Sequence, residues 1–227
     1  NGSRKNRVWQ LSLIPKTTII KNPNQTNLTN LINPKKLSKP MTLSNRKLAG
    51  LLLSTGSIIS FFGIIVSETL YPGYSTAKNV ISDLGIGPSA AVFNIALIIG
   101  GILGIASVLF LYRTFRSKLF AVVIGLSSLG SFFVGAFPEN TGGPHVIGAL
   151  LAFIFGGLAA ILSYRLTKTP FRQVSVVLGA ISLLAFILFI AGIHLGLGGG
   201  GMERMVAYPN MFWSIGFGGN LMAGTND

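Results

Sequence analysis

The sequence contains no cysteine and few charged residues, and each shortage removes a class of protein. Without cysteine the chain has no disulfide framework, no thiolate nucleophile and no cysteine-held metal centre. Charged residues make up only 10% of its 227 residues, whereas water-soluble domains carry about 25%. Half of the residues are hydrophobic and the mean hydropathy is +0.64, which also excludes a disordered chain.

Acidic residues are scarce too, and the formal net charge of +13 is unevenly distributed. Residues 1–47 hold ten Lys and Arg residues, no acid and four prolines, a density that disrupts helices and strands. The other 180 residues hold eight basic and five acidic residues. We therefore expect a basic, Pro- and Asn-rich tail at 1–47, a membrane domain at 48–224 and a short C-terminal end at 225–227.

Six apolar stretches follow the tail, and each is long enough to cross a bilayer. A helix needs about 20 residues to span about 30 Å of hydrocarbon. None of these stretches has the charged face of a soluble helix or the alternation of a barrel strand. The sequence thus predicts an all-α, six-transmembrane-helix bundle with helices within 48–67, 89–112, 119–137, 145–164, 174–195 and 206–223.

The connections between these stretches predict the orientation of the bundle. The tail, residues 113–118 and residues 165–172 together hold 16 of the 18 cations. Because cytoplasmic loops are enriched in Lys and Arg, both chain ends are expected in the cytoplasm. The protein is then a multi-pass protein of the cell membrane.

Titratable groups show the opposite bias and gather on the outer side. Four of the five acids and both histidines lie in or beside the three outer connections. The candidates for acid–base chemistry are Asp83, Glu139, His145 and His194. Simpler interpretations stay open: Asp83 caps the helix that follows it, and His145 lies at the level of the lipid headgroups.

Candidate ligand-binding residues lie in the same region, namely Tyr74, Ser82, Asn94 and Arg204. Asn94 is expected to bond a neighbouring helix or a ligand. Arg204 either pairs with Glu203 on the surface or binds a lipid phosphate with its planar guanidinium group. The glycine-rich residues 196–201 before it are expected to form a flexible hinge or a loop that lipid headgroups approach closely, because no strand precedes them as a nucleotide-binding loop requires.

Other chemistries find little support in the sequence. The histidines lie in no metal-binding helical motif, so we expect no metal and no cofactor. Neither a P-loop nor a GxSxG elbow is present, although Ser75 or Ser82 could meet His145. No charged residue lies mid-membrane, which argues against an ion-coupled pump. The tail has one aromatic residue, so we expect it to contact anionic lipid and no nucleic acid.

Several short motifs together resemble a known family. They are Tyr71-Pro72-Gly73-Tyr74, Ser82-Asp83-Leu84-Gly85, Phe137-Pro138-Glu139, the His145 after Gly-Pro, and Tyr208-Pro209 at the expected start of the sixth helix. Over residues 48–224 the chain resembles a prokaryotic integral membrane family numbered 998 among the domains of unknown function. The string Ile81-Ser82-Asp83 with Gly85 and Pro88 is also similar to an outer loop of the Frag/DRAM/Sfk membrane proteins, which implies a role with lipids.

The sequence therefore predicts a membrane protein that contacts lipids or serves as an accessory subunit of a membrane assembly. Its expected partners are membrane lipids and, through residues 1–47, other membrane subunits. The alternative is a membrane-embedded enzyme that acts on lipid headgroups at the outer face. Convergence of Asp83, Glu139 and His145 around a cavity would favour ligand binding or catalysis over a passive role.

Overall fold

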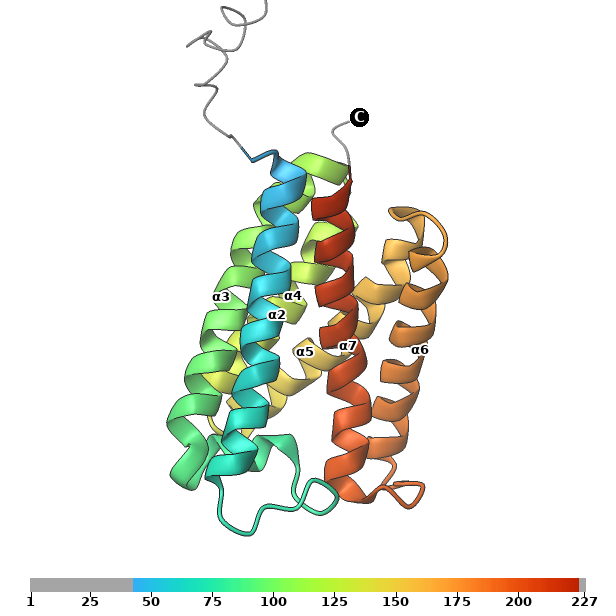
Figure 1. Cartoon of the computed structure of the whole chain (residues 1–227). Helices are drawn as coiled ribbons and strands as arrows, with labels where there is room; N and C mark the ends of the chain where they lie inside the picture. Colours follow the sequence, from blue (N-terminus) through green and yellow to red (C-terminus); the bar gives the residue numbers. More distant parts are fainter. Residues whose placement is uncertain (1–42, 225–227) are drawn as a thin grey trace, which may run out of the picture. The chain divides into compact units, whose positions relative to one another are not determined.

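The structure, a computed structural model, describes residues 43–224, and these residues form helices joined by short connections without any strand. Six long α-helices make up the body (Figure 1), and four short 3₁₀ helices lie in the connections. The α-helices are α2 (Asn45–Leu70), α3 (Ala90–Phe115), α4 (Lys118–Ala136), α5 (Gly143–Leu162), α6 (Phe171–Ile190) and α7 (Gly198–Ala223). The 3₁₀ helices are η2 (Ile81–Gly85), η3 (Gly87–Ser89), η4 (Glu139–Thr141) and η5 (Ser163–Arg165).

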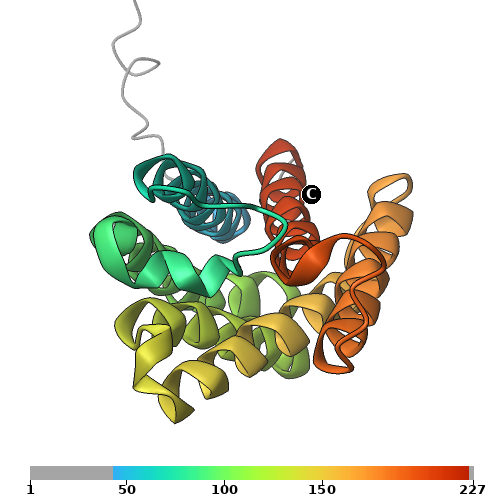
Figure 2. The same cartoon turned by 90° about the horizontal axis from the view of Figure 1, so that it is seen from below.

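The six helices form a ring in which each helix packs on the next one in sequence. The ring closes because α7 returns to pack on α2 and also touches α5. Figure 2 views this ring from the end that carries the α2–α3 connection. The connections α2–α3, α4–α5 and α6–α7 all lie at this end, which we call the polar end; η2 contacts both η4 and α7 there.

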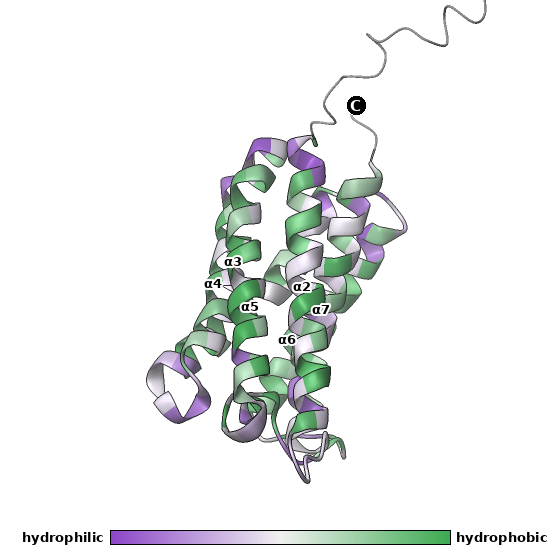
Figure 3. Cartoon of the chain, turned by 60° about the vertical axis from the view of Figure 1, so that its left-hand side comes forward, coloured by the Kyte–Doolittle hydropathy of each residue, from purple (hydrophilic) through white to green (hydrophobic). Residues whose placement is uncertain are grey.

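Five of the helices are long and apolar enough to cross a membrane, with bounds of Asn45–Leu70, Gly87–Phe115, Lys118–Ala136, Gly143–Arg165 and Phe171–Ile190. Large apolar side chains such as Phe62, Ile187 and Leu119 remain exposed on their outer surface, as expected for residues that face lipid. Hydrophobic residues cover the helices and polar ones collect at the ends (Figure 3). The described residues are thus all-helical in their regular structure, and the chain is a multi-pass membrane protein.

The helices pack closely through small residues and serine hydroxyls. A side chain at Gly101 would overlap Phe132 of α4, and one at Gly148 would overlap Phe133. Ser182 of α6 donates to the Val206 carbonyl of α7 at 2.8 Å. Such contacts replace the hydrophobic driving force that is missing between helices in lipid.

The structure corrects three expectations about the last two helices. Helix α6 ends at Ile190, before the predicted end at residue 195. Helix α7 begins at Gly198, so most of the glycine-rich stretch is helical and not a flexible hinge. Pro209 consequently lies inside α7, not at its start.

Candidate functional site

The glycines at the start of α7 let the α2–α3 connection lie directly against that helix. The Gly200 amide donates to the Ala77 carbonyl at 3.0 Å. A Cβ atom on Gly198 would overlap the Ala77 carbonyl, and one on Gly200 would overlap the Asn79 carbonyl. The close approach of two backbones, and not flexibility, explains why these positions are glycine.

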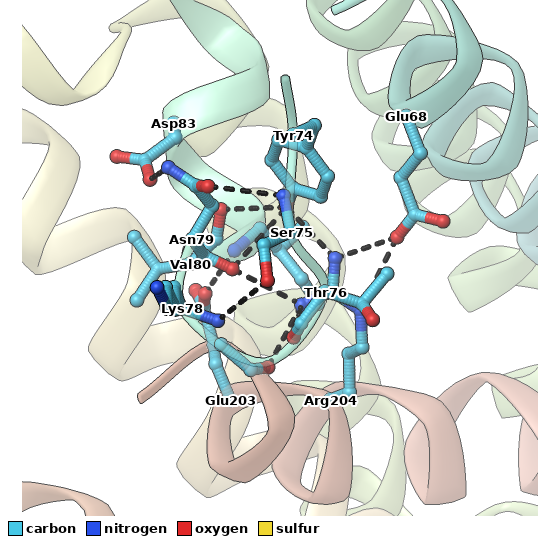
Figure 4. A network of polar contacts seen from close by, with 12 residues as sticks. Glu68, Tyr74, Ser75, Thr76, Lys78, Asn79, Val80, Asp83, Glu203 and Arg204 are labelled. Atoms are coloured by element: carbon cyan, nitrogen blue, oxygen red, sulfur yellow. Dashed lines mark hydrogen bonds and ion pairs between the residues drawn. The ribbon is translucent and has the colours of Figure 1, made fainter. Parts of the chain in front are cut away.

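The Arg204 side chain of α7 bonds both the α2–α3 connection and helix α2 (Figure 4). Its guanidinium group donates to Glu68 of α2 at 2.6 Å and to the Tyr74 hydroxyl at 2.7 Å. It also donates to the carbonyl oxygens of Thr76 at 3.0 Å and Gly200 at 2.8 Å. Arg204 is only 8% exposed, so the expected surface ion pair with its neighbour Glu203 is wrong. A lipid phosphate would have to displace these partners.

Glu203 is buried at the same end, with 4% of its surface exposed. Its carboxylate accepts from the Ile81 amide at the start of η2 and from the Ser82 hydroxyl at 3.1 Å. Glu203 precedes residues 206–223, the part of α7 predicted to span the membrane. Burial raises its pKa to about 7, although the bonds from Ile81 and Ser82 oppose that shift.

His145, at the start of α5, is buried inside the protein, with 4% of its surface exposed. Its Nδ1 atom lies 2.8 Å from the Phe137 carbonyl, and its Nε2 atom lies 3.2 Å from the Ser82 hydroxyl. Because a carbonyl oxygen only accepts, Nδ1 carries a proton. His145, Ser82 and Glu203 therefore form one hydrogen-bonded chain from α5 to α7, which we call the His–Ser–Glu chain.

The other predicted acids lie beside this chain. Asp83 accepts from the Asn79 side chain at 2.9 Å and lies within η2, so it does not cap α3; the residue before α3 is Ser89. Burial, and then the nearby charge of Asp83, raise the pKa of Glu139. The structure thus brings Asp83, Glu139 and His145 to one place.

A cavity of about 130 Å³ lies inside the ring, between α2, α3, α4, α5 and α7. Ser82 and Glu203 line it where η2 meets α7, and Trp213 lines it further along α7. The other lining side chains are mostly apolar groups and serine hydroxyls, with the amide of Asn210. The Oδ1 atom of Asn210 is buried and has no hydrogen-bond partner in the structure. The cavity thus combines a carboxyl group, an unused amide oxygen and apolar walls.

Comparison with known proteins gives a family but no function. The sequence profile described as Protein of unknown function (DUF998) matches residues 54–219, most of the chain. The chain belongs to this family. No curated protein and no solved structure matches the chain. The activity of this DUF998 member must therefore be inferred from its own residues.

Two predicted residues of this DUF998 protein lie apart from the His–Ser–Glu chain. Asn94 donates to the Gly85 carbonyl at 3.1 Å, so it holds η2 and not a neighbouring helix as expected. His194 follows the end of α6 and packs near the ring of Phe189. Within residues 43–224, no three His, Asp or Glu side chains lie close enough together to hold a metal ion.

The sequence interpretation missed the residues that define the cavity, above all Glu203 and Asn210. These two residues are seven positions apart, which places them on one helical face. That spacing was the available signal, because Val206 and Ala207 between them belong to the same buried side of α7. The sequence interpretation assigned Glu203 to the connection before the helix, so its place on the buried face of α7 was not recognised.

Proposed function

We propose that this DUF998 protein contacts lipids and takes a small polar group of an amphipathic molecule into the cavity of its helix ring. The proposal is supported above all by the composition of the cavity, where Glu203 and Ser82 lie among largely apolar lining residues. An amphipathic ligand requires this combination of a few placed polar groups in an apolar pocket.

The size of the cavity limits what it can hold. An apolar cavity of about 150 Å³ binds one benzene molecule, and this one measures about 130 Å³. A headgroup fragment or a short chain segment fits such a volume, whereas a complete phospholipid does not. Most of a lipid would therefore remain in the bilayer.

In the proposed topology residues 206–223 of α7 form the sixth span and both chain ends lie in the cytoplasm. The excess of cations in residues 113–118 and 165–172 supports this orientation. The polar end, with the His–Ser–Glu chain, then faces outward, and the proposed ligand comes from the outer leaflet. A partner bound through residues 1–47 stays a prediction, because most of that segment lies outside the described residues.

The fluorescence of Trp213 can test the proposal, since this residue lines the cavity and is 1% exposed. A Trp9→Phe background leaves Trp213 as the single tryptophan. Tribromoethanol, a quencher about the size of benzene that acts on contact, should quench Trp213 in the purified full-length protein. Ser57 lines the cavity, so Ser57→Leu should reduce quenching severalfold, whereas Ser57→Ala should not. Equal quenching in both variants would refute binding in the cavity.

One contact favours a second candidate, an enzyme that acts on lipid headgroups. His145 Nε2 lies 3.2 Å from the Ser82 hydroxyl, and the Phe137 carbonyl accepts from the other ring nitrogen. When the one hydroxyl proton of Ser82 is donated to Nε2 instead of to Glu203, this is the arrangement of an activated serine and its base. A fluorophosphonate that reacts with activated serines tests this candidate. Labelling of Ser82 that is lost in His145→Gln would support it, and no labelling would contradict it.

A further inference from the structure

Glu203 is the one ionisable side chain among the residues that line the cavity within the described part of the chain. It lies where η2 meets α7, and its neighbours on the wall are apolar, hydroxyl or amide groups. An ionised carboxylate in such a place is costly unless a cation or several donors compensate it. Glu203 is therefore the lining residue that determines which ligand charge the cavity favours.

No basic side chain of the described residues is bonded to Glu203. The adjacent Arg204 directs its guanidinium nitrogens to Glu68, to Tyr74 and to backbone carbonyls, and its ion pair is with Glu68. The two donors that Glu203 receives, from Ile81 and Ser82, are both uncharged. The carboxylate can thus accept a cation without breaking an existing ion pair.

Other lining groups suit the same kind of ligand. The buried Oδ1 atom of Asn210 accepts no hydrogen bond, and it lies two helical turns, about 10 Å, along α7 from Glu203. Three aromatic rings also line the cavity, those of Phe93, Phe153 and Trp213. Aromatic faces attract cations, most strongly where water is excluded. Acceptors and rings both favour a ligand that carries positive charge and N–H donors.

Further acids strengthen this preference at the polar end. Glu139 and Asp83 lie beside the His–Ser–Glu chain, and Glu68 is already matched by Arg204. The groups that face Glu203 are Ser82 and Ile81 from η2, Arg204 from its own helix, and Glu139 from η4. His145 reaches it only through Ser82. Negative groups thus exceed unpaired positive ones at the polar end, outside the cavity wall, a distribution that concentrates cations.

We infer that the cavity recognises a protonated amine, with the Glu203 carboxylate as its counter-ion. The inference rests on the proposed function and names its ligand class. The ammonium group donates to Glu203 Oε atoms, and the attached carbons lie against the aromatic and aliphatic wall toward Trp213. Protonation of Glu203 removes the counter-ion, so affinity for the amine falls when the medium becomes acidic.

Competition against tribromoethanol tests this inference with the Trp213 reporter. Butylammonium, butan-1-ol and butyrate share one chain and differ in the charge of the head. At pH 8.5 we expect butylammonium to displace the quencher at least about tenfold better than butanol, and butyrate to displace it worst. Glu203→Gln should bring butylammonium to the level of butanol. Glu139→Gln, which removes an acid outside the cavity wall, should keep the preference.

The same titration of the wild-type chain at pH 5.5 provides a test that needs no variant. We expect the amine preference to disappear there, because Glu203 is then protonated. Equal displacement by amine and alcohol at pH 8.5, or a preference that survives Glu203→Gln, would overturn the inference while leaving cavity binding intact. Quenching that is insensitive to Ser57→Leu would instead refute the proposed function itself.

A final comparison distinguishes a lipid amine from a free one. In bilayers that contain phosphatidylethanolamine, a lipid ligand should protect Trp213 from the quencher, relative to bilayers of phosphatidylglycerol alone. Protection that appears only after butylammonium is added would assign the site to a free amine. Both results support an amine site, whereas protection by phosphatidylglycerol alone would contradict it.

Discussion

Arg204 and Glu203 are neighbours in sequence and have different roles in the structure. The guanidinium group of Arg204 donates to Glu68, Tyr74 and backbone carbonyls, and these bonds hold the α2–α3 connection against α2 and α7. Glu203 turns to the cavity and keeps only uncharged partners. The sequence indicates two charged residues at an outer position but not this division, because it depends on which way each side chain of α7 faces.

Removing the guanidinium group should destabilise the protein strongly. In Arg204→Gln the Glu68 carboxylate and the carbonyl oxygens of Thr76 and Gly200 lose their donor, so the free energy of unfolding should fall by about 3 kcal/mol. Lys78→Gln is the matched control, since Lys78 is an exposed cation of the same connection. Unfolding in detergent measures both. Equal unfolding free energies of the two variants would show that the bonds of Arg204 do not stabilise the protein.

The raised pKa of Glu203, about 7, predicts how stability depends on pH. The folded state binds more protons than the unfolded state between the ordinary glutamate value and about 7, so unfolding releases a proton there. The ligand-free protein should therefore lose stability as pH rises through this range. Melting temperatures of wild type and Glu203→Gln should converge below the ordinary glutamate value, separate as pH rises toward about 7 and stay apart by a constant amount above it, with the variant more stable. A separation that grows toward acid would have the wrong sign.

At the scale of elements, the apolar runs predicted most helices well. The helix predicted within residues 89–112 is observed as Ala90–Phe115, and the one predicted within 119–137 is observed as Lys118–Ala136. Charge-free runs of this length have few structural alternatives to a helix in lipid. The start of α7 could not be predicted in the same way. Glycine is a poor helix former, and residues 198–201 are helical because the backbone at Ala77 and Asn79 packs on them.

Glycine at position 200 should consequently be required, although glycine is unfavourable in helices generally. Gly200→Ala places a methyl group against the Asn79 carbonyl and should cost at least about 2 kcal/mol of unfolding free energy. Gly219→Ala, on the same helix with no neighbour within 4 Å, should instead add about 0.5–1 kcal/mol. Thermal unfolding of both variants checks the opposite signs; equal signs would refute the backbone-contact explanation.

At the scale of the whole molecule, the candidate site depends on how the ring closes. The sequence predicted that Asp83, Glu139 and His145 share one end, because an up-and-down helical topology places the first and third connections at the same end. It did not predict the cavity, which none of these three residues lines, since the rotation of each helix decides which serines and amides face inward. Convergence at one end and enclosure between helices are thus separate properties, and only the first is visible in a sequence.

The proposed orientation has its own test, which the absence of cysteine makes simple. Asn140→Cys and Lys168→Cys place single thiols at exposed positions of opposite ends of the ring. In intact cells an impermeant maleimide should label residue 140 and not residue 168. Labelling of both from one side would contradict six spans with both chain ends in the cytoplasm.

The most direct test of the account is whether the native protein carries a ligand in its cavity. Mass spectrometry under non-denaturing conditions can weigh the full-length chain released from its own membrane, beside Ser57→Leu and Ser57→Ala. We predict an added mass, from an amphipathic amine, on the wild type and Ser57→Ala and its loss from Ser57→Leu. An adduct shared by all three proteins, or absent from all three, would contradict a ligand-binding cavity.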